Sequence, residues 1–507
     1  MVKRPEDARL GVGQSFAFGF QHVLTLYGGA IAPPLIIGAA AGLDAAGISI
    51  LLAGAMFVGG LGTMLQSWGL PFFGSQLPLV QGVSFSGVAS MLVILQGGGG
   101  LPEVFGAVLV ASLVALIAVP FFAQILKFFP PIVTGIVITT IGLSLMPVGA
   151  DWAAGGAALE GTADYASVEN LLLAAGTLLV VLILSKSGIA ILSRLAILLA
   201  IIIGTAAAAI LGIADLSGVM TGEIVAAPKP FAFGAPTFAV GAILSLVIVN
   251  LVNMTEATAD MLAVGEVVGT KVGRKRIADG LRSDMVSSVL APVFNTFTQA
   301  SFSQNVGLVA ITGVRSRFVV TAGGFILVVM GFLPPLGRLI AAIPDPVLGG
   351  AGIVLFGSVA AAGIRILGKV RYTGNMNIVI VAASLGFGLL PVVSPEIYAQ
   401  MPSWFQVIFG SGICSATLMA IVLNVVFNHW QIGKAKDAAP PAEAYLRVVS
   451  KKHLARFEEG DTIVDGRVLD ADGNEVPAVD HHRYRDLVAR IEAGEITDPE
   501  ELERELD

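Results

Sequence analysis

Apolar residues occur along most of this chain in runs of about 20 residues, separated by short polar stretches. Runs of this length suit helices that cross the hydrocarbon core of a bilayer. The pattern predicts an all-α, polytopic membrane protein with about fourteen spans or half-spans. We expect these to begin near Ser15, Ala45, Leu77, Phe105, Pro130, Val168, Ile189, Ala239, Gly280, Ser301, Arg317, Pro346, Met376 and Ser403.

Two predicted spans, the third (77–95) and the tenth (301–313), are short or broken and rich in Gly, Ser and Gln. Polar groups at membrane depth are tolerated where they face protein or a water-filled cavity. A short extended segment in each of these two spans could pair with the other and satisfy its backbone groups. Hydrogen bonding between packed helices is an alternative explanation for the polar side chains of 300–313.

Two motifs recur at nearly the same offset. Ser84-Phe85-Ser86 returns as Ser301-Phe302-Ser303, 217 residues later, and Pro131 with Gly135 returns as Pro346 with Gly350, 215 residues later. Seven predicted spans fit in each half, and an odd number makes the second half enter the membrane from the opposite side. The chain is therefore predicted to be a 7+7 inverted repeat, with spans 1–7 in 15–214 and spans 8–14 in 236–432. Residues 1–14 and 433–507 would be terminal segments. Inverted repeats with broken spans in corresponding positions are typical of secondary transporters, whose ligand binds near the midplane.

Composition agrees with this class. Of the 507 residues 55% are hydrophobic and 13% charged, and the mean hydropathy is +0.85. A single cysteine, Cys414, excludes a disulfide framework and a thiolate metal cluster. No feature suggests nucleic-acid binding, and the first apolar run is too long for a signal peptide.

Charge in the short loops predicts the orientation. If the N-terminus is cytoplasmic, the cytoplasmic loops carry the basic residues Lys127, Lys186, Arg194, Lys271, Arg274, Lys275, Arg276, Arg315, Arg317, Arg365, Lys369 and Arg371. The opposite loops carry mainly acids: Asp44, Glu103, Asp151, Glu160, Asp164, Asp215, Glu223 and Glu396. This positive-inside pattern predicts a multi-pass protein of the inner membrane with both termini cytoplasmic.

The strongest candidates for chemistry lie in the eighth span, where Glu256 and Asp260 are four residues apart and share one helix face. Burial and mutual repulsion disfavour two charged carboxylates there, so we expect a proton carrier, a ligand acceptor or both. Asp260 could instead be solvated near the cytoplasmic end. Asp279 and Asp284 could be acids that cap the start of the ninth span. A buried His22 could be a packing partner.

Several of these residues together resemble the signature of the nucleobase–ascorbate transporter family, which includes the xanthine/uracil permeases. They are Gln304-Asn305-Val306-Gly307-Leu308-Val309-Ala310-Ile311-Thr312-Gly313, Gln21-His22, Ser84-Phe85, Glu256 and Asp279-Gly280. The resemblance covers about residues 14–430. It implies fourteen spans in a 7+7 inverted repeat with core and gate domains, a homodimer, an elevator-type movement, and coupling to protons or, in animals, sodium.

The resemblance also implies roles for residues. Glu256 accepts hydrogen bonds from the base, Gln304 is the second side-chain contact, and Ser84, Phe85 and Ser303 complete the substrate site. Asp260, Asp279 and His22 are linked to proton coupling or transport, and Asn305, Gly307 and Gln21 support the site. No metal or cofactor is implied besides the coupling proton.

Substrate choice depends chiefly on Gln304, because uracil permeases typically have Glu there and xanthine or urate transporters Gln. The spacing of Glu256 and Asp260 also resembles the purine branch, although Ala259 replaces the Gly of its Glu-x-x-Gly-Asp pattern. We therefore expect proton-coupled symport of xanthine or urate. The alternatives are uracil symport and, more distantly, an inorganic anion transporter or exchanger, which would not need Glu256. An enzyme is not expected, since there is no metal-ligand motif or nucleophile–base pair.

Overall fold

The computed structural model describes residues 4–122, 130–156, 159–372 and 376–429, together with 462–464 and 467–469. Its first half contains η1 (Pro5–Asp7), α1 (Val12–Ala30), α2 (Ala32–Ala40), α3 (Ala45–Trp68), β1 (Gln81–Val83), η2 (Phe85–Gly87), α4 (Val88–Gln96), α5 (Leu101–Ala118), η3 (Val119–Phe121), α7 (Pro131–Ser144), α8 (Met146–Ala154), α9 (Val168–Lys186), α10 (Ala190–Arg194) and α11 (Ala196–Ile210).

The second half contains α12 (Val240–Val268), α13 (Arg274–Leu290), η6 (Ala291–Phe294), β2 (Gln299–Ser301), α14 (Ser303–Thr312), α15 (Arg317–Gly331), α16 (Pro334–Ala341), α17 (Asp345–Leu367), α18 (Met376–Val393), η7 (Pro395–Tyr398), α19 (Ser403–Phe409), α20 (Gly412–Asn424) and η8 (Val425–His429). Strands β3 (Thr462–Val464) and β4 (Arg467–Leu469) form an antiparallel pair of their own. The rest of the predicted C-terminal segment lies outside the described residues.

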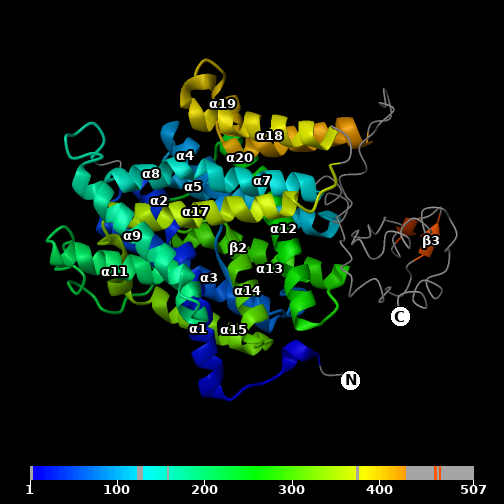
Figure 1. Ribbon diagram of the computed structural model, residues 1–507, viewed down its shortest axis with the longest axis horizontal. Helices are drawn as coiled ribbons and strands as arrows, with labels where there is room; N and C mark the ends of the chain where they lie inside the picture. The colour runs from blue at the N-terminus through cyan, green and yellow to red at the C-terminus, as the bar shows by residue number, and fades with distance from the viewer. Residues whose placement is uncertain are drawn as a thin grey trace, which may run out of the picture.

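The predicted membrane class is confirmed. Within the described residues eight helices are long and apolar enough to cross a membrane, or up to ten if the bent pairs α15–α16 and α19–α20 each form one span. Large apolar side chains such as Leu172 and Ile183 on α9 are exposed on the outside, where lipid would cover them, whereas Phe105 and Phe297 stack in the interior. Figure 1 shows α18 and α20 above α7 and α17, with α12 and α13 next and α3 and α15 below these.

The two short extended segments predicted in the broken spans are present and pair with each other. β1 and β2 form an antiparallel ribbon in which Gly82 lies opposite Ala300. One edge of each strand pairs with the other strand. On the outer edges, the Thr63 hydroxyl of α3 bonds the N–H and carbonyl groups of Gln81, and the Ser288 hydroxyl of α13 bonds those of Gln299, so that these backbone groups are satisfied where water is absent. η2 and α4 follow β1, and α14 follows β2, so that two short helices start beside one ribbon.

Glycines allow two groups of helices to pack with their backbones in contact. In the first group, a Cβ added at Gly60 of α3 would lie 2.6 Å from the Gly324 oxygen of α15, and one at Gly19 of α1 would lie 2.7 Å from the Gly323 nitrogen. In the second group, added Cβ atoms on Gly142 and Gly363 would overlap the facing backbone between α7 and α17. Small residues permit such close approach in membrane helices.

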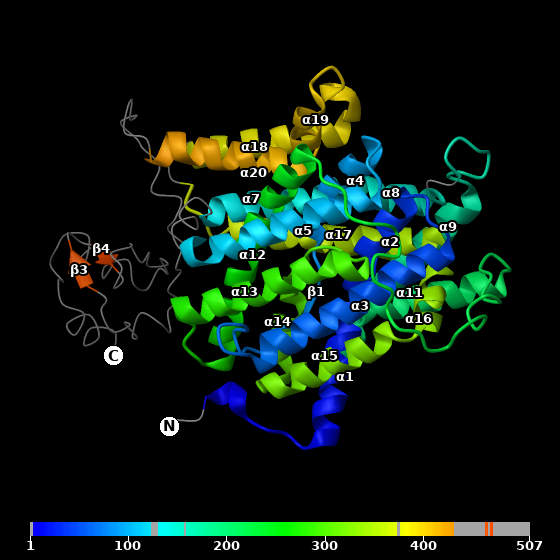
Figure 2. The ribbon, with the colours of Figure 1, turned by 180° about the vertical axis from the view of Figure 1, so that it is seen from behind.

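The segment before α1 is fixed by two ion pairs. Arg276 of α13 binds the buried Glu6 carboxylate at 2.5 Å, and Arg317 of α15 binds Asp7 at 2.6 Å. The segment lies at the same end of the helical bundle as the start of α13 and the C-terminal end of α20 (Figure 2). The predicted basic loops near Arg276 and Arg317 are therefore gathered around the N-terminal segment.

Candidate functional site

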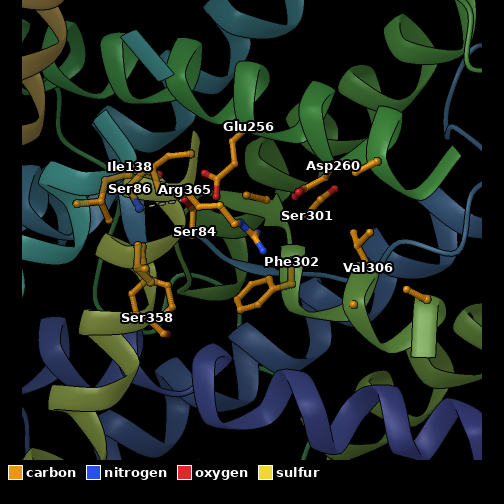
Figure 3. Close-up of a pocket in the computed structure, with 18 of the residues that line it drawn as sticks. Ser84, Ser86, Ile138, Glu256, Asp260, Ser301, Phe302, Val306, Ser358 and Arg365 are labelled. Atoms are coloured by element: carbon orange, nitrogen blue, oxygen red, sulfur yellow. Dashed lines mark hydrogen bonds between the residues drawn. The ribbon is translucent and has the colours of Figure 1, made fainter. Parts of the chain in front are cut away.

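A cavity of about 530 Å³ lies between the β1–β2 ribbon, α12, α14 and the α7–α17 pair. This volume is within the range of roughly 300–1,000 Å³ that is typical of small-molecule sites. Its lining comprises Ser84, Phe85, Ser86, Ile138, Ile141, Glu256, Asp260, Ala263, Val267, Ala300, Ser301, Phe302, Val306, Gly307, Ala310, Ser358, Val359, Ala362 and Arg365. Figure 3 shows the side chains that converge there.

Helix α12 supplies both acids of the cavity. The hydroxyl groups of Thr255 and Thr258 donate hydrogen bonds to the carbonyl oxygens of Leu251 and Met254, which satisfies these polar side chains within a long membrane helix. Glu256 is half-buried because its carboxyl group faces the cavity, and it receives no hydrogen bond from any described residue. A ligand N–H group could therefore bind this carboxyl group directly.

Asp260 lies one turn further along α12 and is also part of the lining. Only 7% of its surface is exposed. The alternative interpretation of Asp260 as a solvated residue at the helix end is therefore wrong, because α12 continues to Val268 and the side chain is enclosed.

The end of β1 presents the first polar arm. Ser84 caps η2 by accepting a hydrogen bond from the Ser86 nitrogen at 3.1 Å, and its hydroxyl donates to Asn253 Oδ1 at 2.8 Å. These bonds attach the β1–η2 turn to α12 one helical turn from Glu256. Phe85 follows and packs edge-to-face on Phe356, with ring centroids 6.2 Å apart.

The end of β2 presents the second arm. Phe302 precedes α14, whose first residues are Ser303 and Gln304; the side chains of these two lie outside the described structure. The Phe302 carbonyl oxygen accepts the Asn305 N–H at 3.0 Å, but Phe302 provides no side-chain cap for the N–H groups that precede that of Asn305. Such N–H groups can donate hydrogen bonds to a carbonyl-rich ligand.

Two aromatic rings border the cavity and meet at a glycine of α1. A Cβ added at Gly29 would lie 3.0 Å from Cε1 of Phe302 and 3.8 Å from Cε2 of Phe85. A residue with a side chain at position 29 would crowd the Phe302 ring, so glycine is needed for the two rings to lie where they do. A flat heterocycle is the kind of ligand that aromatic side chains of this arrangement can contact on its faces.

The predicted supporting residues lie around α14. Nδ2 of Asn305 donates to His22 Nδ1 at 3.0 Å and to the His22 carbonyl oxygen at 3.1 Å, and both residues are buried. The carbonyl can only accept, so the amide nitrogen faces His22, and the neutral ring carries its proton on Nε2. Gly307 lines the cavity, and a Cβ added there would meet no atom within 4 Å. Gln21 precedes His22 on α1 and is not part of the lining.

Asp279 lies away from the cavity. Its carboxylate pairs with Arg282 at 2.6 Å, and its carbonyl oxygen accepts the Gly74 N–H at 2.7 Å. The interpretation of Asp279 and Asp284 as N-terminal caps is wrong, because α13 begins at Arg274 with Gly273 as its N-cap. Asp284 is instead buried in the middle of α13, where the side-chain amides of Gln66 and Gln81 donate to one carboxylate oxygen.

Among the cavity side chains that sequence reasoning missed, Phe302 and Arg365 bear most on the chemistry. Phe302 could have been found, because it repeats Phe85 in the Ser-Phe-Ser match. The charge pattern predicts Arg365 in a cytoplasmic loop, but it lies in the last turn of α17 and extends into the cavity (Figure 3). It forms no ion pair with another described residue. The described residues contain no cluster of acidic, histidine or cysteine side chains that could hold a metal ion.

Known proteins are similar to this chain in sequence. The xanthine/uracil permease profile of the Permease family matches residues 13–397. The uric acid transporter UacT of Escherichia coli (strain K12) is 40% identical over 428 residues, covering 84% of this chain and 88% of that protein. The xanthine permease of Bacillus subtilis (strain 168) is 36% identical over 435 residues, covering 86% and 98%.

Two solved structures have a similar fold at low identity. The transmembrane domain of a cyanobacterium bicarbonate transporter, BicA, has a TM-score of 0.55 and 14% identity, covering 82% of this chain and 98% of that chain. The murine anion transporter Slc26a9 in its inward-facing state has a TM-score of 0.56 and 11% identity, covering 83% and 69%. These likenesses show the fold alone.

Proposed function

Because this chain belongs to the nucleobase–ascorbate transporter family, we propose that it imports an oxidised purine, xanthine or urate, together with a proton. It is a transporter and not an enzyme. Relatives named as uric acid and xanthine permeases support a nucleobase as the substrate. The choice of an oxidised purine over uracil rests on Gln304 and on the acids of α12.

The observation that carries the proposal is the position of Glu256. It is an acid in a membrane helix, it faces the cavity, and no described residue donates a hydrogen bond to it. A lone carboxylate is costly to carry through the membrane unless it is neutralised. An incoming proton, together with a ligand N–H group, would remove that cost.

In the proposed cycle, Glu256 takes up a proton from the outside and the base docks between Phe85 and Phe302. Its ring N–H groups face Glu256, and its carbonyl oxygens face the first backbone N–H groups of α14. The Gln304 carboxamide offers a donor and an acceptor to an imide edge of the base. With Glu256 neutralised by its proton, the loaded site then crosses the membrane, and base and proton leave towards the cytoplasm. Asp260, within the same cavity, is the proposed second acid of proton transfer.

Arg365 supports urate as a substrate. It brings a positive charge into a cavity that holds two acids, and a cation near the ligand favours a weakly acidic base that binds as an anion. We expect Arg365→Gln to weaken urate uptake more than uptake of neutral nucleobases.

The proposed architecture is fourteen spans in a 7+7 inverted repeat. Treating α4, α11, α13 and α14 as further membrane segments, beside the up to ten spans, brings the total to fourteen. The repeat is supported by the pairing of β1 with β2 and by the packing of α7 against α17, which carry the recurring Pro and Gly residues. We assign α7 and α17 to a gate domain and α1, α3, α12, α14 and α15 to a core domain that moves past it as an elevator.

We further propose an inner-membrane location, cytoplasmic termini and a homodimer. The orientation is supported by the basic residues gathered around the N-terminal segment, since Arg276 and Arg317 both bind it. Residues 1–14 and 433–507 would then be cytoplasmic.

The test is uptake into proteoliposomes under an imposed pH gradient, with labelled xanthine, urate, guanine and uracil compared. We expect xanthine or urate to accumulate, and Glu256→Gln to abolish accumulation. Accumulation of the base to the wild-type level in that variant would contradict the proposed role of Glu256. Gln304→Glu should weaken xanthine uptake and shift competition towards uracil; an unchanged competition profile would show that Gln304 does not contact the base.

A further inference from the structure

A second cavity lies at the N-terminus of α13, away from the proposed substrate site. Its volume is about 740 Å³. Its lining is dominated by cations and by the loop after α3: Arg4, Gly69, Leu70, Pro71, Phe72, Gly74, Ser75, Gln76, Thr270, Lys271, Gly273, Lys275, Arg276 and Asp279.

The charge of this cavity is strongly positive once its ion pairs are taken into account. Arg276 is matched by Glu6, and the one acid of the lining, Asp279, is matched by Arg282. Lys271 and Lys275 are exposed and form no ion pair with a described residue, and Arg4 donates only to the neutral Gln76 side chain, at 3.0 Å. An excess of positive charge therefore faces an open volume.

The backbone and a buried hydroxyl add hydrogen-bond donors to the same place. α13 is 17 residues long, its N-cap Gly273 offers no side-chain cap, and a Cβ added at Gly273 would meet no atom within 4 Å. Its free N–H groups and its dipole favour an anion. Ser75, also in the lining, is fully buried and its hydroxyl has no partner among the described residues.

An apolar turn stands beside the cations. Leu70 and Phe73 exchange two backbone hydrogen bonds across Pro71 and Phe72, and Phe72 has a φ of +69°, at a turn position that usually requires glycine. This strained turn leaves Leu70 58% and Phe72 67% exposed. Arg276 fixes the loop by donating to the carbonyl oxygens of Ser75 at 2.5 Å and Gln76 at 2.8 Å.

We propose that this cavity binds the phosphate of an anionic phospholipid headgroup, with the Leu70–Phe72 turn inserted beside the acyl chains. Cations together with free helix N–H groups suit a phosphate, and an exposed aromatic ring suits the membrane interface. A soluble phosphate compound has the same anionic group but has no acyl chains to contact the apolar Leu70–Phe72 turn. The site lies on the cytoplasmic face if the proposed orientation is correct, and it does not depend on which base is transported.

The test uses the purified, delipidated full chain in neutral detergent. Binding of phosphatidylglycerol, phosphatidylcholine and inorganic phosphate is measured by native mass spectrometry and thermal unfolding. We expect phosphatidylglycerol to bind and stabilise the protein, and phosphatidylcholine to have little effect. Lys271→Gln with Lys275→Gln should weaken phosphatidylglycerol binding about 10- to 30-fold, since each lysine near an anionic lipid contributes roughly 1 kcal/mol.

The matched control is Lys186→Gln with Lys369→Gln, which removes the same charge elsewhere. Equal lipid affinity in the two double variants would overturn the site. Phe72→Gly relieves the strained turn and removes the ring, so it should lower lipid affinity without unfolding the protein. Tight binding of inorganic phosphate that depends on the two lysines, with lipid binding unaffected by Phe72→Gly, would overturn the lipid assignment in favour of a soluble ligand.

Discussion

One nitrogen atom of Asn305 binds His22 twice, through the imidazole Nδ1 and through the main-chain carbonyl oxygen. The two residues lie on α14 and α1, 283 positions apart in the chain. The contact therefore holds the start of α14, and with it the proposed substrate site, against the first helix. The carbonyl oxygen can only accept, so this contact needs a donor at this position.

Asn305→Asp should disrupt this attachment more than Asn305→Ala. The aspartate would place a buried acceptor against the His22 carbonyl oxygen and would require the imidazole to move its proton to Nδ1, whereas alanine only removes the donor. We expect Asn305→Asp to cost about 1–3 kcal/mol of the free energy of unfolding and to abolish uptake. Thermal unfolding in detergent and uptake in proteoliposomes measure the two effects. An aspartate variant as stable as the alanine variant would contradict the role of the double hydrogen bond.

Ser84 and Asn253 should behave as one unit. The Ser84 hydroxyl donates to Asn253 Oδ1, and this hydrogen bond joins the β1–η2 turn to α12. Removing either partner leaves the other buried without its bond. In a double-mutant cycle with Ser84→Ala and Asn253→Ala, we expect a coupling of about 0.5–3 kcal/mol in uptake efficiency. Additive single effects would show that the two residues act separately.

Gly29→Ala should narrow the cavity by displacing an aromatic ring. The new Cβ would lie 3.0 Å from Phe302, so that this ring must shift towards the cavity. Overpacking of this kind typically costs about 1–3 kcal/mol, and we expect a several-fold rise in the KM for the base. Gly13→Ala is the control on the same helix, because its Cβ would meet no atom within 4 Å. Equal KM values in the two variants would argue against contact of Phe302 with substrate.

Arg276→Ala should destabilise the protein much more than Arg317→Ala. The partner of Arg276 is Glu6, whose side chain is fully buried, whereas Asp7, the partner of Arg317, is 33% exposed. Loss of Arg276 would leave a buried charge without its counter-ion, which costs about 3–5 kcal/mol. A partly exposed pair is worth roughly 0–1 kcal/mol. Thermal unfolding of the two variants measures which one is less stable. Adding Glu6→Gln to Arg276→Ala should restore part of the lost stability, because it removes the unpaired buried charge.

Hydropathy predicts helix starts well where an apolar run follows a polar loop. Helices α3, α9, α15, α18 and α19 begin at the predicted residues. The ninth span was predicted to start near Gly280, six residues after the observed start at Arg274, because helical hydrogen bonding continues through the charged first turns of α13. The 80° and 81° bends at α15–α16 and α19–α20 were not predicted, since the apolar composition of a run does not show where its helix axis changes direction.

The site residues that could be predicted from the sequence are those whose charge or polarity is costly inside a membrane. Glu256 stands out because an acid is costly in lipid, and the structure places it in the cavity. Arg365 was missed because a charge near the end of an apolar run looks like a loop residue. The contact of Gly29 with Phe302 was out of reach, because it depends on how closely two helices approach.

The backbone contacts between α3 and α15 limit how this protein can move. Where Gly60 meets Gly324, no side chain can change its rotamer to let one helix slip along the other. We therefore expect these helices to travel as a single block throughout the transport cycle. Displacement must then take place along surfaces made of side chains, such as the one where Arg365 of α17 and Glu256 of α12 line the cavity.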